Sequence, residues 1–176
     1  MVEPGRPLAD EYLDYFETYI SLVPESDILN QLDSQTSDMS AMRAAVPADQ
    51  EQVLHAPYTW TIKQVVGHCI DTERVFAYRA ARFAAGDKTS LPGFDQDTFV
   101  ANTDYNACEL GSLVDELVET RKSNLSLFRR QNNESWMRGG SADGKKMTVR
   151  AAAYVMVGHI RYHWAIVRKR LSGATQ

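Results

Sequence analysis

Hydrophobic residues recur at intervals of three and four along most of the chain, which is the spacing of one face of an α-helix. We find no convincing stretch with the regular alternation of a β-strand. The helical pattern covers five segments, which are residues 8–22, 27–46, 61–85, 108–130 and 148–171. The sequence therefore predicts an all-α protein in which a short N-terminal helix precedes four long helices.

The segment 61–85 carries the clearest local signals. Thr61 is followed three residues later by Gln64, which is the pattern of a capping box, and Gly86 stands where the helix should end. The apolar stripe of this segment includes one carboxylate, Glu73, which could be the buried partner of an arginine in an ion pair. The candidate partners are Arg74, Arg79 and Arg161.

Two connections between the predicted helices are long. Residues 86–107 contain aromatic, acidic and turn residues and could cover one end of a bundle, or they could form a packed structural loop anchored by Phe94 and Phe99. Residues 132–146 contain three glycines, and we expect a flexible connection without specific chemistry. His55 lies between two prolines without a partner at helical spacing, so we expect it in an exposed loop.

Length and composition fit one folded domain, which we expect to span residues 1–176. Hydrophobic residues make up 44% and charged residues 24% of the chain, which are ordinary globular values. The net charge of −4 offers no basic surface to nucleic acid. The chain has no apolar run of about 20 residues and no signal-sequence pattern, so we expect a cytoplasmic protein without a membrane partner. Two cysteines are too few for a disulfide framework.

The candidate chemistry lies in three histidines. His159 and His163 are one helical turn apart, within about 80° and about 40° of the apolar centre of their helix, so both should point into the bundle. His68 lies at the flank of the buried face of the segment 61–85. Imidazole nitrogens bind zinc, nickel, copper or iron, and one cation would satisfy several buried rings at once. The alternative is that these are surface histidines or core histidines with ordinary hydrogen-bond partners. Cys69 diverges from His68 by about 100° and is expected to be a small buried residue.

The residues around the histidines exclude two classes of metalloenzyme. The motif HIRYH lacks the glutamate that serves as the base in an HExxH protease. A ferritin-like di-iron site needs a glutamate three positions before each histidine, and these positions hold Met156 and Ile160. Three carboxylates, Asp71, Glu73 and Asp95, are candidate general acids or bases, and none is assigned that role. Five aromatic residues are candidates for the cavity lining, which are Tyr58, Trp60, Phe94, Tyr162 and Trp164.

Several patches of the chain together resemble the DinB/YfiT superfamily of metal-binding four-helix bundles. They are YTWTIKQVVGHCIDTERVFAYRAARFAAGD at 58–87, LPGFDQDTFV at 91–100, RKSNLSLFRR at 121–130, SWMRGG at 135–140 and MTVRAAAYVMVGHIRYHWAIV at 147–167. The resemblance implies an up, down, down, up order of the four helices, and often a homodimer. It also implies one divalent metal ion bound by three histidines, which fall on His68, His159 and His163. Nickel or zinc is expected first, and iron, manganese and copper stay open.

The resemblance also sets the expected function. Members of the family include transferases and isomerases that use the thiols bacillithiol or mycothiol, and others look like metal-dependent hydrolases. We therefore expect a metal-dependent enzyme that activates a low-molecular-weight thiol or water and acts on a small electrophilic substrate. Two alternatives stay open, which are a non-catalytic, stress-related bundle that binds a metal or a small ligand, and an interaction module without a metal.

Overall fold

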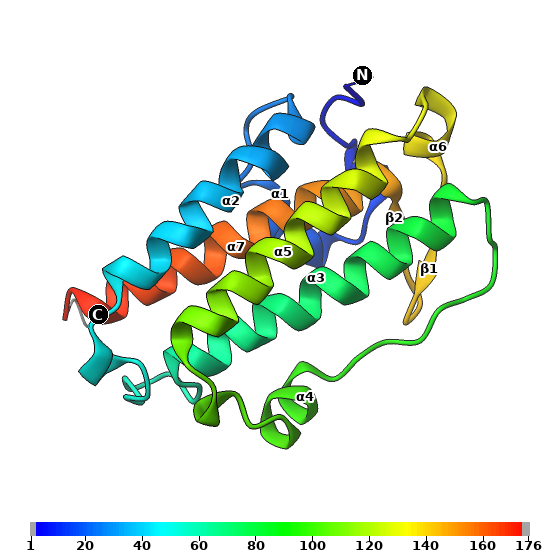
Figure 1. Cartoon of the computed structure of the whole chain (residues 1–176). Coiled ribbons are helices and arrows are strands. Elements are labelled where there is room, and N and C mark those ends of the chain that lie inside the picture. The colour runs from blue at the N-terminus through cyan, green and yellow to red at the C-terminus, as the bar shows by residue number, and fades with distance from the viewer. Residues whose placement is uncertain (1–2, 174–176) are drawn as a thin grey trace.

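Four long helices lie side by side and form the body of the molecule (Figure 1). They are α2 (Ile28–Ala45), α3 (Ile62–Ala84), α5 (Leu110–Arg129) and α7 (Val149–Leu171). The structure, a computed structural model, describes residues 3–173. Helices α2 and α7 run in one direction and α3 and α5 in the other, so the order along the chain is up, down, down, up (Figure 1). The predicted all-α four-helix bundle is confirmed.

The parallel course of α3 and α5 requires a connection as long as the bundle, and this segment runs along the outside of the helices (Figure 1). It contains the short helix α4 (Gln96–Asn102) and the 3-10 turn η4 (Tyr105–Ala107), and both pack on α3. Asp95 caps α4, because its carboxylate accepts hydrogen bonds from the backbone N–H groups of Asp97 and Thr98. The expected loop is therefore largely ordered.

The expected N-terminal helix over residues 8–22 is broken into three pieces. These are the 3-10 turns η1 (Ala9–Glu11) and η2 (Asp14–Phe16) and the short helix α1 (Glu17–Ile20). The chain opens out because Tyr12 forms a β-bridge with Met147 and because the buried carboxylate of Glu11 forms an ion pair with Arg150 of α7. These contacts bind the segment to Met147 and to α7, and they take the place of a continuous helix.

The expectation of a flexible connection over residues 132–146 is wrong. The chain forms the helix α6 (Asn133–Met137) and then an antiparallel hairpin of β1 (Gly139–Ala142) and β2 (Lys145–Thr148). Asp143 and Gly144 link the strands with φ of 55° and 68°, the left-handed conformations of a two-residue hairpin turn. Trp136 is buried and holds α6 in place, because its ring stacks on that of Phe128 of α5 with the ring centroids 5.5 Å apart.

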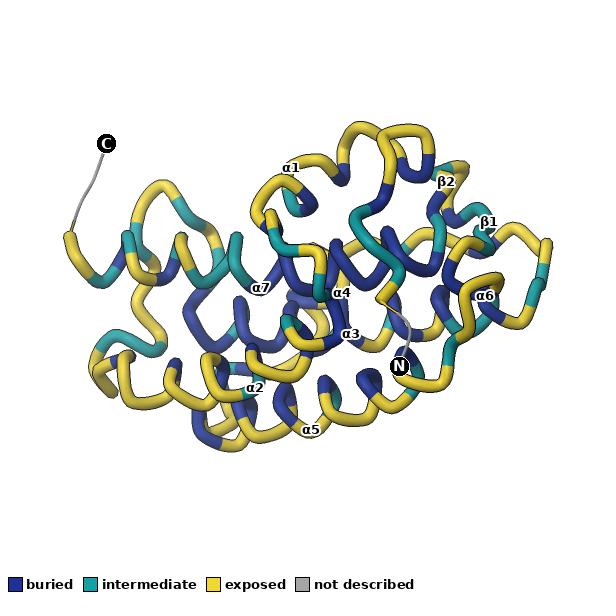
Figure 2. Tube along the Cα trace, turned by 90° about the horizontal axis from the view of Figure 1, so that it is seen from above, coloured by how far each residue is buried: buried dark blue, intermediate teal, exposed yellow. Residues whose placement is uncertain are grey.

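The N-terminal half of α7 is buried on all sides, and Figure 2 shows it dark blue there while α2 and α5 each expose one side. Helix α7 contacts α1, α2, α3 and α6. The contact with α1 requires Gly158, because a Cβ atom there would lie 2.0 Å from the backbone oxygen of Tyr19. Within residues 3–173, no helix combines the length and apolar character that a membrane span requires.

A buried polar network joins the four long helices at the middle of the bundle. Arg121 of α5 is fully buried and donates to both carboxylate oxygens of Glu73 on α3, at 3.0 and 2.6 Å. Its guanidinium also donates to the side-chain oxygen of Gln35 on α2 at 2.6 Å and to the backbone oxygen of Met156 on α7 at 3.2 Å. Gln35 in turn donates to the backbone oxygen of Val157 at 3.0 Å. One ion pair therefore holds four helices in register.

Of the two roles considered for Glu73, the structure shows the buried ion pair, but none of the three candidate arginines is its partner. Arg74 pairs with Glu116 at the surface, and Arg161 pairs with Glu25. The true partner, Arg121, is 48 residues from Glu73 in the sequence and lies on a different helix. Only the packing of α3 on α5 brings the two together.

Candidate metal centre

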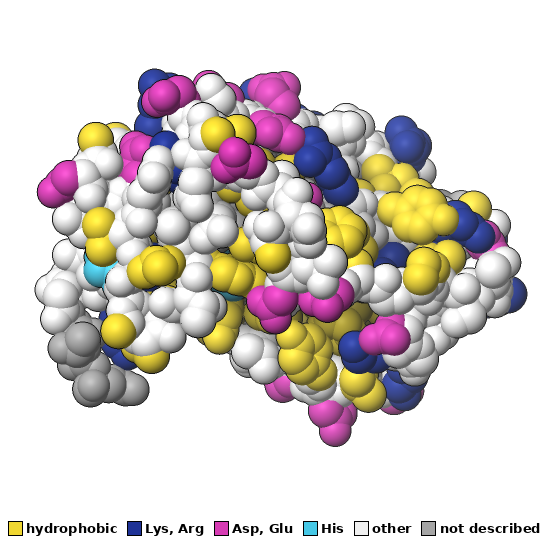
Figure 3. All heavy atoms as spheres, turned by 90° about the horizontal axis from the view of Figure 1, so that it is seen from below, with side chains coloured by type: hydrophobic (Ala, Val, Ile, Leu, Met, Phe, Trp, Pro, Cys, Tyr) yellow, Lys and Arg dark blue, Asp and Glu magenta, His cyan; other side chains and the backbone are white. Residues whose placement is uncertain are grey.

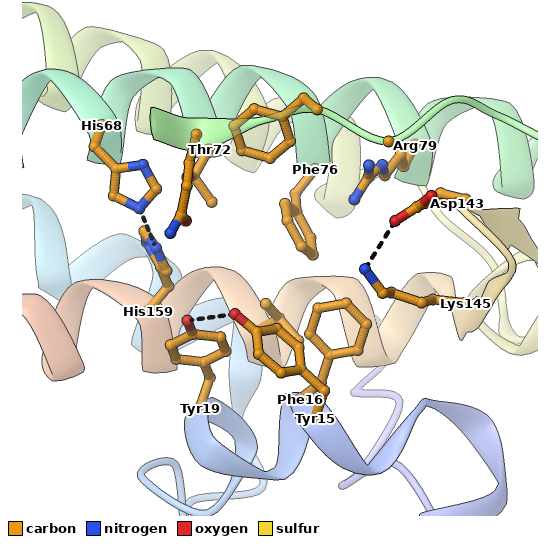
Figure 4. A pocket seen from close by; sticks show the side chains of 15 residues that line it. Tyr15, Phe16, Tyr19, His68, Thr72, Phe76, Arg79, Asp143, Lys145 and His159 are labelled. Carbon is orange, nitrogen blue, oxygen red and sulfur yellow. Dashed lines mark hydrogen bonds and ion pairs between the residues drawn. The ribbon is translucent and has the colours of Figure 1, made fainter. Parts of the chain in front are cut away.

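The three predicted histidines meet inside the bundle. His68 extends from α3 toward α7, where His159 and His163 lie one turn apart, and Figure 4 shows His68 and His159 facing one another. The ring centroid of His68 lies 4.8 Å from that of His159 and 4.9 Å from that of His163. The ring centroids of His159 and His163 are 4.4 Å apart. One ligand nitrogen from each ring lies within 4.8 Å of the others. The structure therefore brings together side chains that are 91 residues apart in sequence.

Local signals set the position of His68 along α3. The Thr61 hydroxyl accepts a hydrogen bond from the backbone N–H of Gln64 at 3.1 Å, and the Gln64 side chain accepts one from the backbone N–H of Thr61 at 3.0 Å. This reciprocal cap fixes where the helix begins. His68 follows Thr61 by seven residues, or about two turns, and so points to the same side of the helix as the cap.

Aromatic rings enclose the cluster. Trp60 lies 4.9 Å from the ring of His68, Tyr19 lies 5.2 Å from His159, and Tyr162 lies 5.2 Å from His163. His68 and His159 are only 2% and 4% exposed, whereas His163 is half-buried. The sequence places His163 nearer than His159 to the apolar centre of the helix, yet His159 is the more deeply buried of the two. The reason is that α1 packs over His159, which the sequence of α7 alone cannot show.

Burial keeps the three imidazoles neutral near pH 7. It lowers the pKa of His68 to about 4 and that of His163 to about 3, and the neighbouring His68 adds to the effect on His163. Burial together with His163, His68 and Arg121 lowers the pKa of His159 well below its usual value. A neutral imidazole keeps a nitrogen lone pair, which is the form that binds a metal.

The donor set fits a divalent cation. The Nε2 atoms of His68 and His159 are 3.0 Å apart. Two nitrogens that each lie about 2.1 Å from one cation are about 3.0 Å apart at a right angle and about 3.4 Å apart at the tetrahedral angle. The other nitrogen of the His68 ring, Nδ1, is buried and has no hydrogen-bond partner among residues 3–173. Nitrogen ligands of this kind suit zinc, nickel, copper and iron.

Acid is expected to destabilise the metal-free protein between about pH 6.5 and pH 4. In this range the unfolded chain protonates His68 and the folded chain does not, so the free energy of unfolding falls by up to about 1.4 kcal/mol per pH unit for this histidine. Urea unfolding at several pH values measures the slope. A His68→Phe variant should show a shallower slope, and an unchanged slope would mean that His68 titrates equally in both states.

Two larger cavities adjoin the histidines, in addition to a small apolar pocket that touches His163. The first, of about 180 Å³, is lined by His68 and His159 and extends toward the β1–β2 hairpin (Figure 4). The second, of about 410 Å³, is lined by His163 together with Trp60 and Tyr162. Three residues border both cavities, which are Tyr15, Tyr19 and Gln96. Figure 3 shows the molecule from the side of α4, where hydrophobic side chains gather near the middle of the face with acidic groups beside them. The cluster is therefore bordered by two neighbouring cavities.

None of the three candidate carboxylates lines either cavity. Asp71 accepts a hydrogen bond from the Tyr105 hydroxyl at 2.5 Å, Glu73 belongs to the buried network, and Asp95 caps α4. Cys69 is buried as expected and does not belong to the ligand group, and burial raises the pKa of its thiol. The sequence therefore named no acid or base that reaches the cluster.

Other expectations about the surroundings have mixed outcomes. Tyr58, Trp60 and Tyr162 line the second cavity and Phe94 the first, whereas Trp164 lines a separate apolar pocket with His163. His55 is half-buried instead of exposed, because it forms hydrogen bonds with Gln50 and Arg170 away from the cluster.

Sequence reasoning missed three residues beside the cluster. Thr72 lines the first cavity with a buried hydroxyl that has no hydrogen-bond partner in the described part of the chain. Its position one turn after His68 is a signal that could have identified it. Tyr19 and Gln96 come from α1 and α4, and no spacing in the sequence links them to the histidines.

Comparisons with known proteins agree with this fold. YfiT from Bacillus subtilis, described as a probable metal-dependent hydrolase with an unusual four-helix bundle topology, superposes with a TM-score of 0.71. It is 17% identical, and the match covers 99% of this chain and 100% of YfiT. The DinB-like protein YjoA from the same organism matches with a TM-score of 0.57 and 18% identity over 85% of this chain and 93% of its own.

At these identities the two structures establish the fold alone. No curated protein matches the chain. Residues 31–167 match the family described as the DinB superfamily. Because this match covers well over half of the sequence, the chain belongs to the DinB superfamily.

Proposed function

We propose that this protein is a metal-dependent enzyme in which His68, His159 and His163 hold one divalent cation, with nickel or zinc the first candidates. The observation that carries the proposal is the convergence of the three neutral imidazoles, whose ligand nitrogens lie within 4.8 Å of one another beside two cavities. The likeness to YfiT, described as a probable metal-dependent hydrolase, supports it. Three protein ligands are typical of catalytic sites because they leave a position for a reactant.

The cation, when bound, lowers the pKa of a water or a thiol and so supplies a nucleophile near neutral pH. The residues of the chain provide the surroundings. Trp60, Tyr19 and Tyr162 limit access of bulk water to the rings. Burial raises the pKa of Tyr19, so its hydroxyl keeps its proton and can donate a hydrogen bond to a substrate oxygen in either cavity. The unpartnered hydroxyl of Thr72 offers a second polar contact in the first cavity.

The two cavities favour a reaction with two substrates. A low-molecular-weight thiol could occupy the cavity beside His163 while an electrophile occupies the cavity beside His68 and His159. In such a transfer the thiol sulfur bonds to the electrophilic carbon, and the thiol proton leaves with the displaced group or enters the adduct. Hydrolysis, in which water takes the place of the thiol, is the second candidate, and the description of YfiT favours it.

Metal analysis of tag-free protein tests the site. Purified protein loaded with nickel or zinc should retain about one ion per chain after gel filtration. A His68→Ala variant should retain none, because it loses one of the three ligands, and a His55→Ala variant should retain the ion because His55 lies outside the group. Equal retention by both variants would refute the proposed ligand set.

An activity panel then separates the candidate functions. The loaded protein is assayed with several thiols against several electrophiles and, separately, with ester and amide substrates in the absence of thiol. Turnover that needs both a thiol and the metal supports S-transfer, and turnover without thiol supports hydrolysis. Tight metal binding with no turnover in any metal form would instead favour the non-catalytic binding protein.

A further inference from the structure

The guanidinium of Arg79 lies in the first cavity at the end away from the histidines, next to the hairpin (Figure 4). Arg79 belongs to the same stripe of α3 as His68, Thr72 and Phe76, and all four side chains line the cavity. The steps between them are four, four and three residues, which keeps them on one face of the helix. The helix therefore presents the proposed metal ligand and a cationic group to one space.

Arg79 is only 7% exposed and forms no ion pair among residues 3–173. Its one hydrogen bond runs from Nη2 to the backbone oxygen of Pro92 at 3.3 Å. The guanidinium lies over the rings of Phe76 and Phe94, with its central carbon 5.2 and 6.0 Å from the ring centroids. Most of its five N–H donors thus have no partner among the described residues.

The nearest acidic group does not neutralise Arg79. The Asp143 carboxylate lowers the energy of the charged guanidinium through space, but it forms its ion pair with Lys145 at 2.9 Å. Lys145 also lines the cavity, so this end carries two cations and one anion. A buried, fork-shaped donor with free N–H groups is suited to a carboxylate or a phosphate, which accept two parallel hydrogen bonds.

We propose that Arg79 binds an anionic group of the substrate, a carboxylate or a phosphate, while the reactive end of the same molecule lies at the histidines. The second half of this statement rests on the proposed function. Residues 68 and 79 are about 16 Å apart along the axis of α3, so the substrate is elongated. Phe16, Phe76 and Phe94 line the space between, which suits an apolar middle. The substrate class is therefore an organic acid or phosphate ester with an apolar body.

Binding of hexanoate to the full-length, metal-free protein tests the role of Arg79. Isothermal titration should show binding of hexanoate and much weaker binding of hexanamide, its neutral analogue. Hexyl phosphate, titrated in the same way, distinguishes a carboxylate site from a phosphate site. An Arg79→Gln variant should lose affinity for the preferred anion by about tenfold or more, because charge-assisted hydrogen bonds disappear. Its affinity for hexanamide should not change.

Two further variants control for charge and folding. Arg82→Gln removes a cation three residues along the same helix whose partner is Asp87, and it should bind hexanoate as the parent protein does. Arg79→Lys keeps the charge without the planar fork and should fall between the parent and Arg79→Gln. The Nε–Hε resonance of Arg79, assigned with the Lys variant, should shift when hexanoate is added, and this readout decides the matter if Arg79→Gln fails to fold.

The outcomes separate this proposal from the metal site. Equal binding of hexanoate and hexanamide, or hexanoate binding that Arg79→Gln leaves unchanged, would overturn it. Hexanoate binding only to the metal-loaded protein, unaffected by Arg79→Gln, would also overturn it and leave the metal centre intact. Binding through Arg79 in a protein that shows no turnover would sustain the anion site and count against the enzyme function.

Discussion

Replacing Arg121 with methionine is expected to lower the free energy of unfolding by about 3–5 kcal/mol. The substitution leaves the buried carboxylate of Glu73 without its cation and removes the donor to Gln35 and Met156. Urea unfolding of the metal-free protein, followed by circular dichroism, measures the loss. Because this network holds the backbone just before His159, the variant should also bind the metal more weakly.

The exposed ion pair between Arg129 and Asp33 is a matched control, because it joins α5 to α2, as Arg121 does through Gln35. The two side chains are 44% and 53% exposed, and such pairs contribute about 0–1 kcal/mol. Arg129→Met should therefore have little effect. If Arg121→Met were no more destabilising than Arg129→Met, the buried network would not be a main support of the bundle. A double variant, Glu73→Leu with Arg121→Met, should recover part of the loss because no unpaired charge stays buried.

Gly158→Ala is expected to cost about 2–3 kcal/mol of stability, even though alanine is the better helix former. The added Cβ would lie 2.0 Å from the backbone oxygen and 2.6 Å from the carbonyl carbon of Tyr19, and backbone atoms cannot turn aside as a side chain can. α1 would have to move away from α7 and take the Tyr19 ring off His159. Urea unfolding measures the stability, and tyrosine fluorescence reports the displacement.

Gly111 provides the control for this substitution, because it also lies in a long helix and is also crowded. A Cβ at Gly111 would meet the guanidinium of Arg43 at 2.5 Å, but that group is the far end of an exposed, flexible side chain. Gly111→Ala should change stability by between about 0 and 1 kcal/mol in the favourable direction. A loss from Gly158→Ala no larger than the effect of Gly111→Ala would show that α1 adapts without strain.

The four long helices could be predicted within one or two residues because their signals are local. The cap formed by Thr61 and Gln64 is present as expected, and α7 begins after Thr148, whose hydroxyl caps it. The one polar interruption of the apolar seam in α2, Gln35, has its explanation in the buried network. Its spacing from Leu32 and Met39 places it on the buried face of α2, but its partners lie on other helices.

The hairpin and the N-terminal turns could not be derived from hydrophobic periodicity. Residues 139–142 are small and do not alternate, and the strand forms because it pairs with β2 and with Leu91 of the connection. The Asp143–Gly144 pair is a recognised hairpin signal, and it was the one local hint. The break at Tyr12 depends on Met147, which is 135 positions further along the chain, so no local rule could indicate it.

For the site, the spacing in HIRYH and the family resemblance predicted three histidines that the structure brings together. The surrounding residues come from α1, α4 and the hairpin, which are the elements whose positions the sequence described least well. Arg79 illustrates the limit. Its place on α3 was known, but its lack of a carboxylate partner depends on where the hairpin lies.

The parallel arrangement of α3 and α5 has an evolutionary consequence. The link between them runs beside both cavities and contributes Phe94, Gln96 and Asp97 to their walls, while Leu91, Val100 and Tyr105 anchor it in the hydrophobic core. Changes at the exposed positions between these anchors can therefore alter which molecules enter without disturbing the framework that holds the imidazoles. Related bundles can in this way acquire different substrate preferences through changes in this one link.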